Sequence, residues 1–194
     1  MQDIAERRAT YADLEAVPPH LVAEILDGGL VTHPRPVPRH ALISPVLLDE
    51  LVGPYQKGRT GPGGWVFMNE PELHLGEHVV VPDLAAWRRE RLPELPETAW
   101  IETSPDWVCE ILSPSTEKVD RCQKRRIYGE FGVAHLWLVD PRARMLETFE
   151  LVGAHWQVGP TFSDAAKVCS PPFAEHSFSL GLLWPFDTMP TPEG

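Results

Sequence analysis

Cysteine is scarce in this chain, and its thiols are far apart. Only three of the 194 residues are cysteine, and Cys109, Cys122 and Cys169 form no Cys-x-x-Cys pair. A disulfide framework usually contains an even number of cysteines, and a thiolate zinc site needs closely spaced pairs. The sequence therefore favours reduced thiols and argues against both of these architectures.

Long apolar runs are also missing. The chain has no stretch of about 18 apolar residues that could span a bilayer, and residues 1–17 lack the apolar core of a secretory signal. We therefore expect a cytoplasmic protein that has no membrane partner.

Positive charge is the third shortage. The chain has 17 Lys and Arg residues against 28 Asp and Glu residues, which gives a formal net charge of −11. Proteins that coat nucleic acids neutralise many phosphates with Lys and Arg. This balance therefore argues against a general coat protein, although it leaves room for a local basic patch.

The remaining composition is that of a folded domain. Hydrophobic residues make up 43% of the chain and charged residues 23%, which is too apolar for intrinsic disorder. The length suits one domain, since domains commonly have about 100–200 residues. We predict a single domain over residues 1–187 and a disordered tail over residues 188–194.

Residue patterning predicts a mixed α/β (α+β) fold. Helices are expected where apolar residues recur at helical spacing, over residues 10–17, 40–53 and 117–131. Strands are expected in apolar or alternating runs, over residues 21–33 (a hairpin), 65–70, 71–75, 78–87, 106–113, 134–140, 145–151, 155–159 and 176–184. A crossover helix between the strands of Glu110 and Trp137 indicates a mixed β-sheet flanked by helices, with extra N-terminal and C-terminal hairpins.

Two acidic residues interrupt apolar strand faces. Alternation places Asp83 on an apolar face of the strand 78–87, and it places Glu110 on an apolar face of the strand 106–113. Burying an isolated carboxylate costs several kcal/mol, so buried carboxylates are normally paired, hydrogen-bonded or bound to a metal. We predict that these two carboxylates lie on neighbouring strands and are close enough to share a divalent cation.

The helix that follows Glu110 presents a lysine towards the same region. At 100° per residue, Lys124 falls on one stripe with Asp120, Ile127 and Tyr128, and it could reach the Glu110 carboxylate. An exposed ion pair between Asp120 and Lys124, four residues apart, explains the same pattern without any catalysis. The residues alone leave both interpretations open.

Several motifs occur in a fixed order and are more specific together than alone. They are VAEILDGGLVTHP at 22–34 followed by His40, VPDLAAW at 81–87, DWVCEILSPST at 106–116, DRCQKRRIY at 120–128 and FGVAHLWLVDP at 131–141. This combination resembles the Uma-type putative restriction endonuclease family, within the PD-(D/E)XK nuclease superfamily. The resemblance covers roughly residues 10–185 of the chain.

The resemblance implies a restriction-endonuclease-like fold and a metal-dependent endonuclease that hydrolyses phosphodiester bonds of DNA. An aspartate and a glutamate at the positions of Asp83 and Glu110 would hold Mg²⁺, or Mn²⁺ in its place, against the scissile phosphate. The carbonyl oxygen of Ile111 is a further expected ligand, since hard cations prefer oxygen. Lys124 would stabilise developing negative charge or orient the attacking water. Glu24 matches an additional acidic position of the family, where it would bind a second metal or its water.

Three alternatives stay open on the sequence. The superfamily usually carries its lysine two residues after the glutamate, where this chain has Leu112, and in the family the lysine comes from the next helix, here as Lys124. The same fold could therefore serve as a catalytically inactive interaction module. A glycosidase that uses Asp83 and Glu110 as its carboxylate pair is the second alternative. For Glu24 alone, a solvated strand glutamate is an equally good interpretation.

Basic residues follow two of the candidate site residues in the sequence. They are Arg88, Arg89 and Arg91 after Asp83, and Arg125 and Arg126 after Lys124. They could contact phosphate, or they could form ordinary solvated faces.

Three further features of the sequence are less specific. His74 and His78 have a spacing that invites a zinc site, but on a hairpin they are expected to be exposed loop residues. His40 either lines a cleft or serves as a polar group at a helix start. An apolar edge near Trp184 and Phe186 could support a homodimer.

Overall fold

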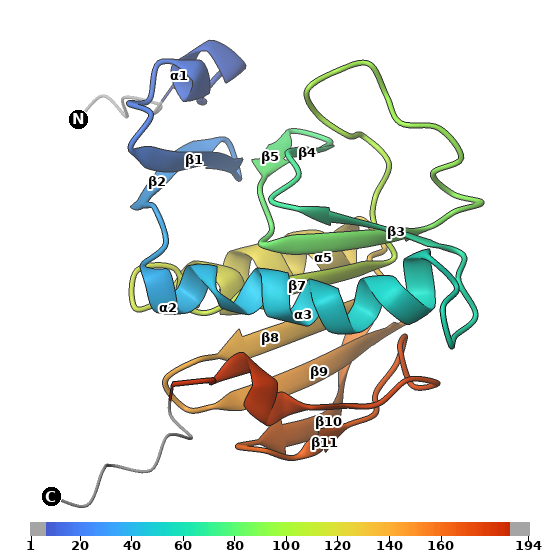
Figure 1. The fold of residues 1–194 in the computed structure, drawn as a ribbon. Helices are drawn as coiled ribbons and strands as arrows, with labels where there is room; N and C mark the ends of the chain where they lie inside the picture. Colours follow the sequence, from blue (N-terminus) through green and yellow to red (C-terminus); the bar gives the residue numbers. More distant parts are fainter. Residues whose placement is uncertain (1–6, 187–194) are drawn as a thin grey trace, which may run out of the picture.

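The computed structural model describes residues 7–186, and the predicted tail, 188–194, lies outside the described residues. The strands form a six-stranded, a four-stranded and a two-stranded sheet, and helices pack against them (Figure 1). The predicted mixed α/β (α+β) fold is confirmed. Among residues 7–186, no helix is both long enough and apolar enough to cross a membrane.

The six-stranded sheet forms the centre of the fold. Its order is β10 (His155–Ser163), β9 (Met145–Val152), β8 (His135–Asp140), β7 (Trp107–Ile111), β6 (Leu84–Arg88) and β3 (Trp65–Asn69). β7 and β8 pair in parallel, and the other neighbours pair antiparallel. Parallel neighbours need a crossover connection, which the helical segment 117–130 supplies.

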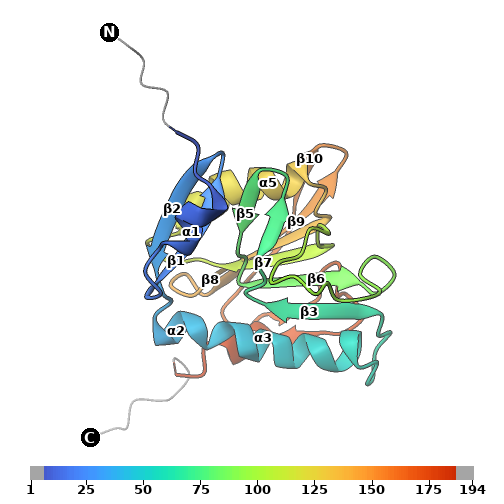
Figure 2. The ribbon, with the colours of Figure 1, turned by 90° about the horizontal axis from the view of Figure 1, so that it is seen from above.

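Both faces of the central strands β6, β7 and β8 are buried, which explains why these strands are almost continuously apolar. Figure 2 shows α3 (Ile43–Leu51) on one side of the strands and α5 (Arg125–Glu130) on the other. In β7, Ile111 packs in the core on the α3 side, and Val108 packs in the core on the α5 side. Glu110 alternates with Ile111, so its carboxylate points to the α5 side.

The four-stranded sheet packs against the α5 side of this core. Its order is β2 (Gly29–Pro34), β1 (Leu21–Leu26), β5 (His78–Val80) and β4 (Leu73–Leu75). The hairpin predicted over residues 21–33 is confirmed as β1 and β2. Asp27 and Gly28 both have positive φ in its turn, 55° and 76°, as a tight hairpin turn requires.

The single strand predicted over residues 78–87 is wrong. The segment divides into β5, in the four-stranded sheet, and β6, in the six-stranded sheet, with Val81, Pro82 and Asp83 between them. Pro82 has no amide hydrogen for a strand ladder, which favours a break at this point. As a result, Asp83 lies at the junction of the two sheets instead of in the middle of a strand.

The helices are shorter and less regular than expected. The helix predicted over 10–17 is α1 (Tyr11–Glu15), with the capping box of Thr10 and Asp13 in place. The helix predicted over 40–53 becomes α2 (Pro38–Ala41), α3 and a π-helical turn (Val52–Gln56). The helix predicted over 117–131 becomes α4 (Glu117–Val119), a π-helical turn (Asp120–Lys124) and α5. π-helical turns are rare and frequently lie at functional sites.

The strand predicted over residues 176–184 is also wrong for most of its length. The segment forms the two-residue β12 (Phe178–Ser179), paired with β11 (Lys167–Val168), and continues as a 3₁₀ helix (Leu180–Leu183). Gly181 lies in this turn, and glycine weakens a strand because it has no side chain to pack.

Candidate active site

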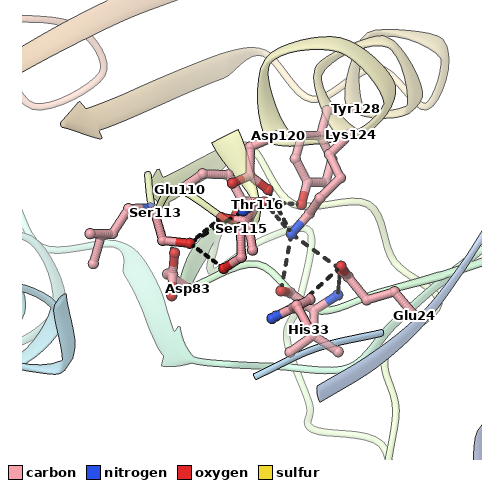
Figure 3. A network of polar contacts seen from close by, with 12 residues as sticks. Glu24, His33, Asp83, Glu110, Ser113, Ser115, Thr116, Asp120, Lys124 and Tyr128 are labelled. Atoms are coloured by element: carbon pink, nitrogen blue, oxygen red, sulfur yellow. Dashed lines mark hydrogen bonds and ion pairs between the residues drawn. The ribbon is translucent and has the colours of Figure 1, made fainter. Parts of the chain in front are cut away.

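A cleft of about 410 Å³ collects the candidate residues from separate parts of the chain. β1 and β2 contribute one wall, the segment 113–116 after β7 contributes another, and Asp83, Glu110 and Lys124 also line it. Figure 3 shows Lys124 reaching from its helix between Glu110 and Glu24. Four of the residues singled out in the sequence are therefore near one another.

The carboxylates of Asp83 and Glu110 both line this cleft, Asp83 from the residue before β6 and Glu110 from β7. Leu84 of β6 pairs with Cys109 of β7, so Asp83, one residue earlier, is next to Glu110 in the register. Asp83 Oδ2 accepts a hydrogen bond of 2.6 Å from the amide of Ile111. The prediction of neighbouring strands holds for β6 and β7 but not for Asp83 itself, which lies one residue before β6. The sharing of a cation stays a prediction.

Burial controls the protonation of these carboxylates. Glu110 is 2% exposed. Burial raises the pKa of Glu110 well above its usual range, and the carboxyl groups of Asp120 and Asp83 raise it further against the opposing charge of Lys124. Burial also raises the pKa of Asp83. Burial is the largest cause of the raised pKa in both residues, ahead of repulsion between the carboxylates.

Lys124 is the central cation of the site. Its Nζ lies 2.9 Å from Glu110 Oε1 and 3.1 Å from Glu24 Oε1, and Asp120 Oδ1 is 3.6 Å away. It also donates a hydrogen bond of 3.2 Å to the carbonyl oxygen of Val81. Burial favours the neutral amine, but Glu110 and Glu24 hold the pKa of Lys124 well above its usual range. The exposed Asp120–Lys124 pair considered for the sequence is wrong, because Lys124 is only 3% exposed.

Glu24 is a buried partner of Lys124 and not a solvated strand residue. It is 1% exposed. Its Oε1 accepts a hydrogen bond of 2.8 Å from the Val81 amide in addition to the contact with Lys124. Burial opposes ionisation of Glu24, but Lys124, the nearby His33 and the hydrogen bond from the Val81 amide hold its pKa below the usual value. In the metal-free site, Glu24 and Lys124 thus form the charged pair.

Tyr128 and His33 complete the network, and neither side chain was assigned a role from the sequence. The Tyr128 hydroxyl donates a hydrogen bond of 2.5 Å to Glu110 Oε1, the oxygen that Lys124 also contacts. His33 Nε2 lies 3.6 Å from Glu24 Oε2, and this carboxylate raises the pKa of His33. The helical stripe places Tyr128 inward, but its hydroxyl contact depends on how the helix docks on the sheet.

His40 lines the cleft, which decides between its two sequence interpretations. It is buried, its Nε2 donates a hydrogen bond of 2.5 Å to the carbonyl oxygen of Ile111, and it lies 3.7 Å from Asp83 Oδ2. The Ile111 carbonyl, predicted as a metal ligand, is therefore a hydrogen-bond acceptor of His40. Its role as a metal ligand stays a prediction.

The basic residues after Asp83 do not lie beside the cleft. Asp83 lies directly before β6, and Arg88 is the last residue of that strand. At about 3.3 Å per strand residue, the two residues are about 16 Å apart. Arg88 lies over the Trp65 ring, and Arg91 is paired with Asp106 at 2.7 Å. On the helix, Arg126 is paired with Asp27 and Glu130. Arg88, Arg91 and Arg126 thus contact groups of the protein itself, and phosphate contact by the basic residues stays a prediction.

The histidines of the β4–β5 hairpin are not exposed loop residues, in contrast to the sequence interpretation. His78 is buried, and its Nδ1 accepts a hydrogen bond from the Asp27 amide. His74 stacks on Trp100 with ring centroids 4.6 Å apart, and its Nε2 lies 2.8 Å from Glu72. Within residues 7–186, no three His, Cys, Asp or Glu side chains are grouped so that they could hold a metal ion.

The oxygen atoms of Asp83 and Glu110 nevertheless suit a magnesium ion. Across the described part of the chain, Asp83 Oδ1 and Glu110 Oε2 take part in no hydrogen bond or ion pair, while the second oxygen of each group is occupied. Mg²⁺ in phosphate chemistry is commonly held by one or two carboxylates together with water and substrate phosphate. Two carboxylates with a free oxygen each meet that requirement.

An apolar hollow of about 350 Å³ lies beside Trp184 and Phe186, where the sequence suggested a homodimer contact. Its lining is mainly apolar and includes Leu42 and Leu183. The homodimer stays a prediction.

Comparison with known proteins identifies the family. The family model described as Uma2, putative restriction endonuclease, matches residues 8–182, which is most of the chain. The chain belongs to the Uma2 family. The same fold occurs in the crystal structure of a putative nuclease belonging to DUF820 from Anabaena variabilis, with a TM-score of 0.71 and 23% sequence identity over 91% of this chain and 98% of that chain. A search of curated proteins gives no match.

Membership in the Uma2 family confirms the resemblance found in the sequence. In this Uma2 protein, Leu112 is 1% exposed and packs in the core with Ile127 of α5. The position two residues after Glu110 is thus part of the core, and Lys124 brings an ammonium group to Glu110 from the helix. In the sequence, the lysine is not two residues after the glutamate, where the superfamily usually has it. In the structure, it nevertheless lies beside that glutamate.

Proposed function

We propose that this protein is a metal-dependent endonuclease that hydrolyses phosphodiester bonds of DNA. The observation that carries the proposal is the set of Asp83, Glu110 and Lys124 facing one cleft, with the ammonium group 2.9 Å from the Glu110 carboxylate. The matches to putative nucleases support the same reaction class. The cofactor we propose is Mg²⁺, with Mn²⁺ as a substitute.

Asp83 and Glu110 are the residues that would hold the ion, through Asp83 Oδ1 and Glu110 Oε2. The chemistry supplied there would be polarisation of a phosphoryl oxygen and activation of a water as nucleophile. Asp83 is kept in place by the Ile111 amide, and Glu110 is kept in place by Tyr128 and Lys124. The protein thus fixes both ligands before substrate arrives.

Lys124 is the charge stabiliser in this proposal. Its ammonium group lies beside the ligands, where negative charge develops on the phosphate oxygens during in-line attack. Glu24 accepts from Lys124 and from the Val81 amide, which fixes the position of the ammonium group. Glu24 is therefore proposed as a positioning residue for Lys124, instead of the ligand to a second metal that the sequence suggested.

The test of this proposal is cleavage of end-labelled single-stranded and duplex DNA by the purified wild-type protein. We expect internal cuts with Mg²⁺ or Mn²⁺ and none with EDTA. If a folded, monodisperse preparation leaves both DNA forms intact with either metal, the protein is not a nuclease. The interaction module then becomes the better account.

The buried Tyr128 hydroxyl provides a finer test. We expect Tyr128→Phe to lose about 1–2 kcal/mol of unfolding free energy, since it deletes one buried hydrogen bond, and to cleave DNA more slowly because Glu110 is less well held. Tyr55→Phe is the matched control, because the Tyr55 hydroxyl accepts a hydrogen bond of 2.8 Å from the His176 amide away from the cleft. Urea denaturation and cleavage rates measure both. Equal cleavage by the two variants would exclude a positioning role for Tyr128.

A further inference from the structure

The cleft has a floor and two walls of different chemistry. Asp83, Glu110 and Lys124 form the charged floor. One wall is mainly apolar and comes from the first hairpin and the segment that follows it. Leu21, Val22, Pro34, Pro36 and Val37 line it, and His33 and Arg35 are its polar members.

The opposite wall carries hydroxyl groups. Ser113 Oγ lies 2.9 Å from Ser115 Oγ and 3.0 Å from Thr116 Oγ1, so the three hydroxyls form one cluster that lines the cleft (Figure 3). Serine and threonine hydroxyls commonly donate to phosphate and sugar oxygens of nucleic acids. A polynucleotide could therefore place its phosphates and sugars on this wall and its bases on the apolar wall.

The depth of the floor limits what can react there. Glu110 and Lys124 are only 2% and 3% exposed, so a scissile phosphate reaches them only by entering the cleft. A volume of about 410 Å³ is typical of sites for small molecules. Duplex DNA is stiff over the length of such a cleft, whereas an unpaired strand can bend to bring one phosphate to the floor.

The surface charge points the same way. Duplex binding rests on a broad set of Lys and Arg residues that neutralise phosphates. Many arginines instead form ion pairs with Asp or Glu; those whose pairs lie within residues 7–186 include Arg7, Arg8, Arg91, Arg121, Arg126, Arg142 and Arg144. Their charges are largely offset within the protein, which leaves less positive potential for a duplex than the composition alone indicates.

We infer that the substrate of this cleft is an unpaired DNA strand and that intact duplex is excluded from it. Cleavage of the strand rests on the proposed nuclease function. The preference for an unpaired strand, in contrast, comes from the cleft walls. The bases contact the apolar wall of the hairpin and residues 34–37, and one phosphate descends to the floor. Duplex DNA is cut only where a segment is unpaired.

The binding test uses fluorescent oligonucleotides of one sequence as single strand, as blunt duplex and as duplex with an internal unpaired segment. Ca²⁺, which binds oxygen ligands at longer distances, replaces Mg²⁺ during the anisotropy measurements. We expect the single strand to bind at least about tenfold more tightly than the blunt duplex. With Mg²⁺ or Mn²⁺, cuts should fall within the unpaired segments.

A charge placed on the apolar wall tests the location. Val37 is 64% exposed and is the N-cap of α2, where it makes no side-chain capping hydrogen bond. Aspartate is a favourable N-cap residue, so Val37→Asp should fold well while it repels the strand. We expect single-strand binding to weaken about fivefold or more, the effect of one like charge near a phosphate. Val158→Asp is the control, because Val158 is 73% exposed on β10 and does not line the cleft.

The outcomes separate this inference from the proposed function. Cutting of blunt duplex as fast as single strand overturns the inference and keeps the nuclease. Single-strand binding that Val37→Asp weakens, without any cutting in Mg²⁺ or Mn²⁺, supports the inference and refutes the nuclease. Equal binding by the Val37→Asp and Val158→Asp variants, or no binding of the single strand at all, overturns the inference.

Discussion

Lys124→Met is expected to abolish most DNA cleavage and to destabilise the fold. Cleavage should fall by about 10²-fold or more, the effect of deleting one group that stabilises transition-state charge. The unfolding free energy should fall by about 3–5 kcal/mol, because the variant leaves the buried Glu24 carboxylate without its cation. Cleavage rates and urea denaturation, below the unfolding transition, measure the two effects separately.

A second substitution distinguishes catalysis from stability in this experiment. Glu24→Gln in the Lys124→Met background removes the orphaned charge, so a large part of the lost stability should return while cleavage stays low. Lys118→Met is the matched control, since Lys118 is exposed on the same helical segment and should change neither quantity. If the double variant recovers cleavage together with stability, Lys124 has only a structural role.

Glu110→Gln is expected to stop metal-dependent cleavage without harming the fold. Gln keeps the shape of a protonated glutamic acid but is a poor ligand for Mg²⁺, so cleavage should fall by about 10²-fold or more. Tyr128 and Lys124 can still donate to the Gln carbonyl oxygen. The variant should therefore unfold at the same denaturant concentration as the wild type, or at a higher one.

The pH dependence of stability gives this variant an independent readout. Burial raises the pKa of Glu110 in the folded protein, so the folded state binds more protons than the unfolded state at pH values above about 4.3, the ordinary pKa of a glutamate. Unfolding free energy from this group then falls as the pH rises through that value. Glu110→Gln cannot ionise and does not lose this unfolding free energy. Its stability advantage over the wild type without metal should therefore grow from pH 4 towards pH 7. An advantage that shrinks over this range would contradict the raised pKa.

The sequence predicted the central strands and the hairpin well because their patterns are local. Alternation in β7 puts Glu110 on the face towards α5, and Asp27-Gly28 specifies the turn of the first hairpin. The pattern did not predict the strand break at Pro82, because an apolar run has the same pattern whether it forms one strand or two strands in different sheets. Proline was the signal that could have shown it.

The convergence of site residues could be predicted only in part. Alternation and the helical stripe point Glu110 and Lys124 inward, and the family resemblance added Glu24. The partnership of Glu24 with Lys124 depends on how the hairpin docks beside β5, which spacing in the chain does not specify. For the same reason, the hydroxyl of Tyr128 and the ring of His40 were not assigned their contacts with Glu110 and Ile111.

In the proposed site, Asp83 and Glu110 together hold a divalent ion. Binding of Mn²⁺, followed by electron paramagnetic resonance, is the measurement that tests this. Mn²⁺ shares the oxygen preference of Mg²⁺, and only the unbound ion gives a strong signal in solution. We expect the wild type to reduce the free-ion signal by binding Mn²⁺, and we expect Asp83→Asn and Glu110→Gln each to weaken that binding by about tenfold or more. Lys124→Met, which removes a repelling cation, should bind at least as well as the wild type. Identical titrations for the wild type and both carboxylate variants would contradict the account, because the ion would then bind elsewhere or not at all.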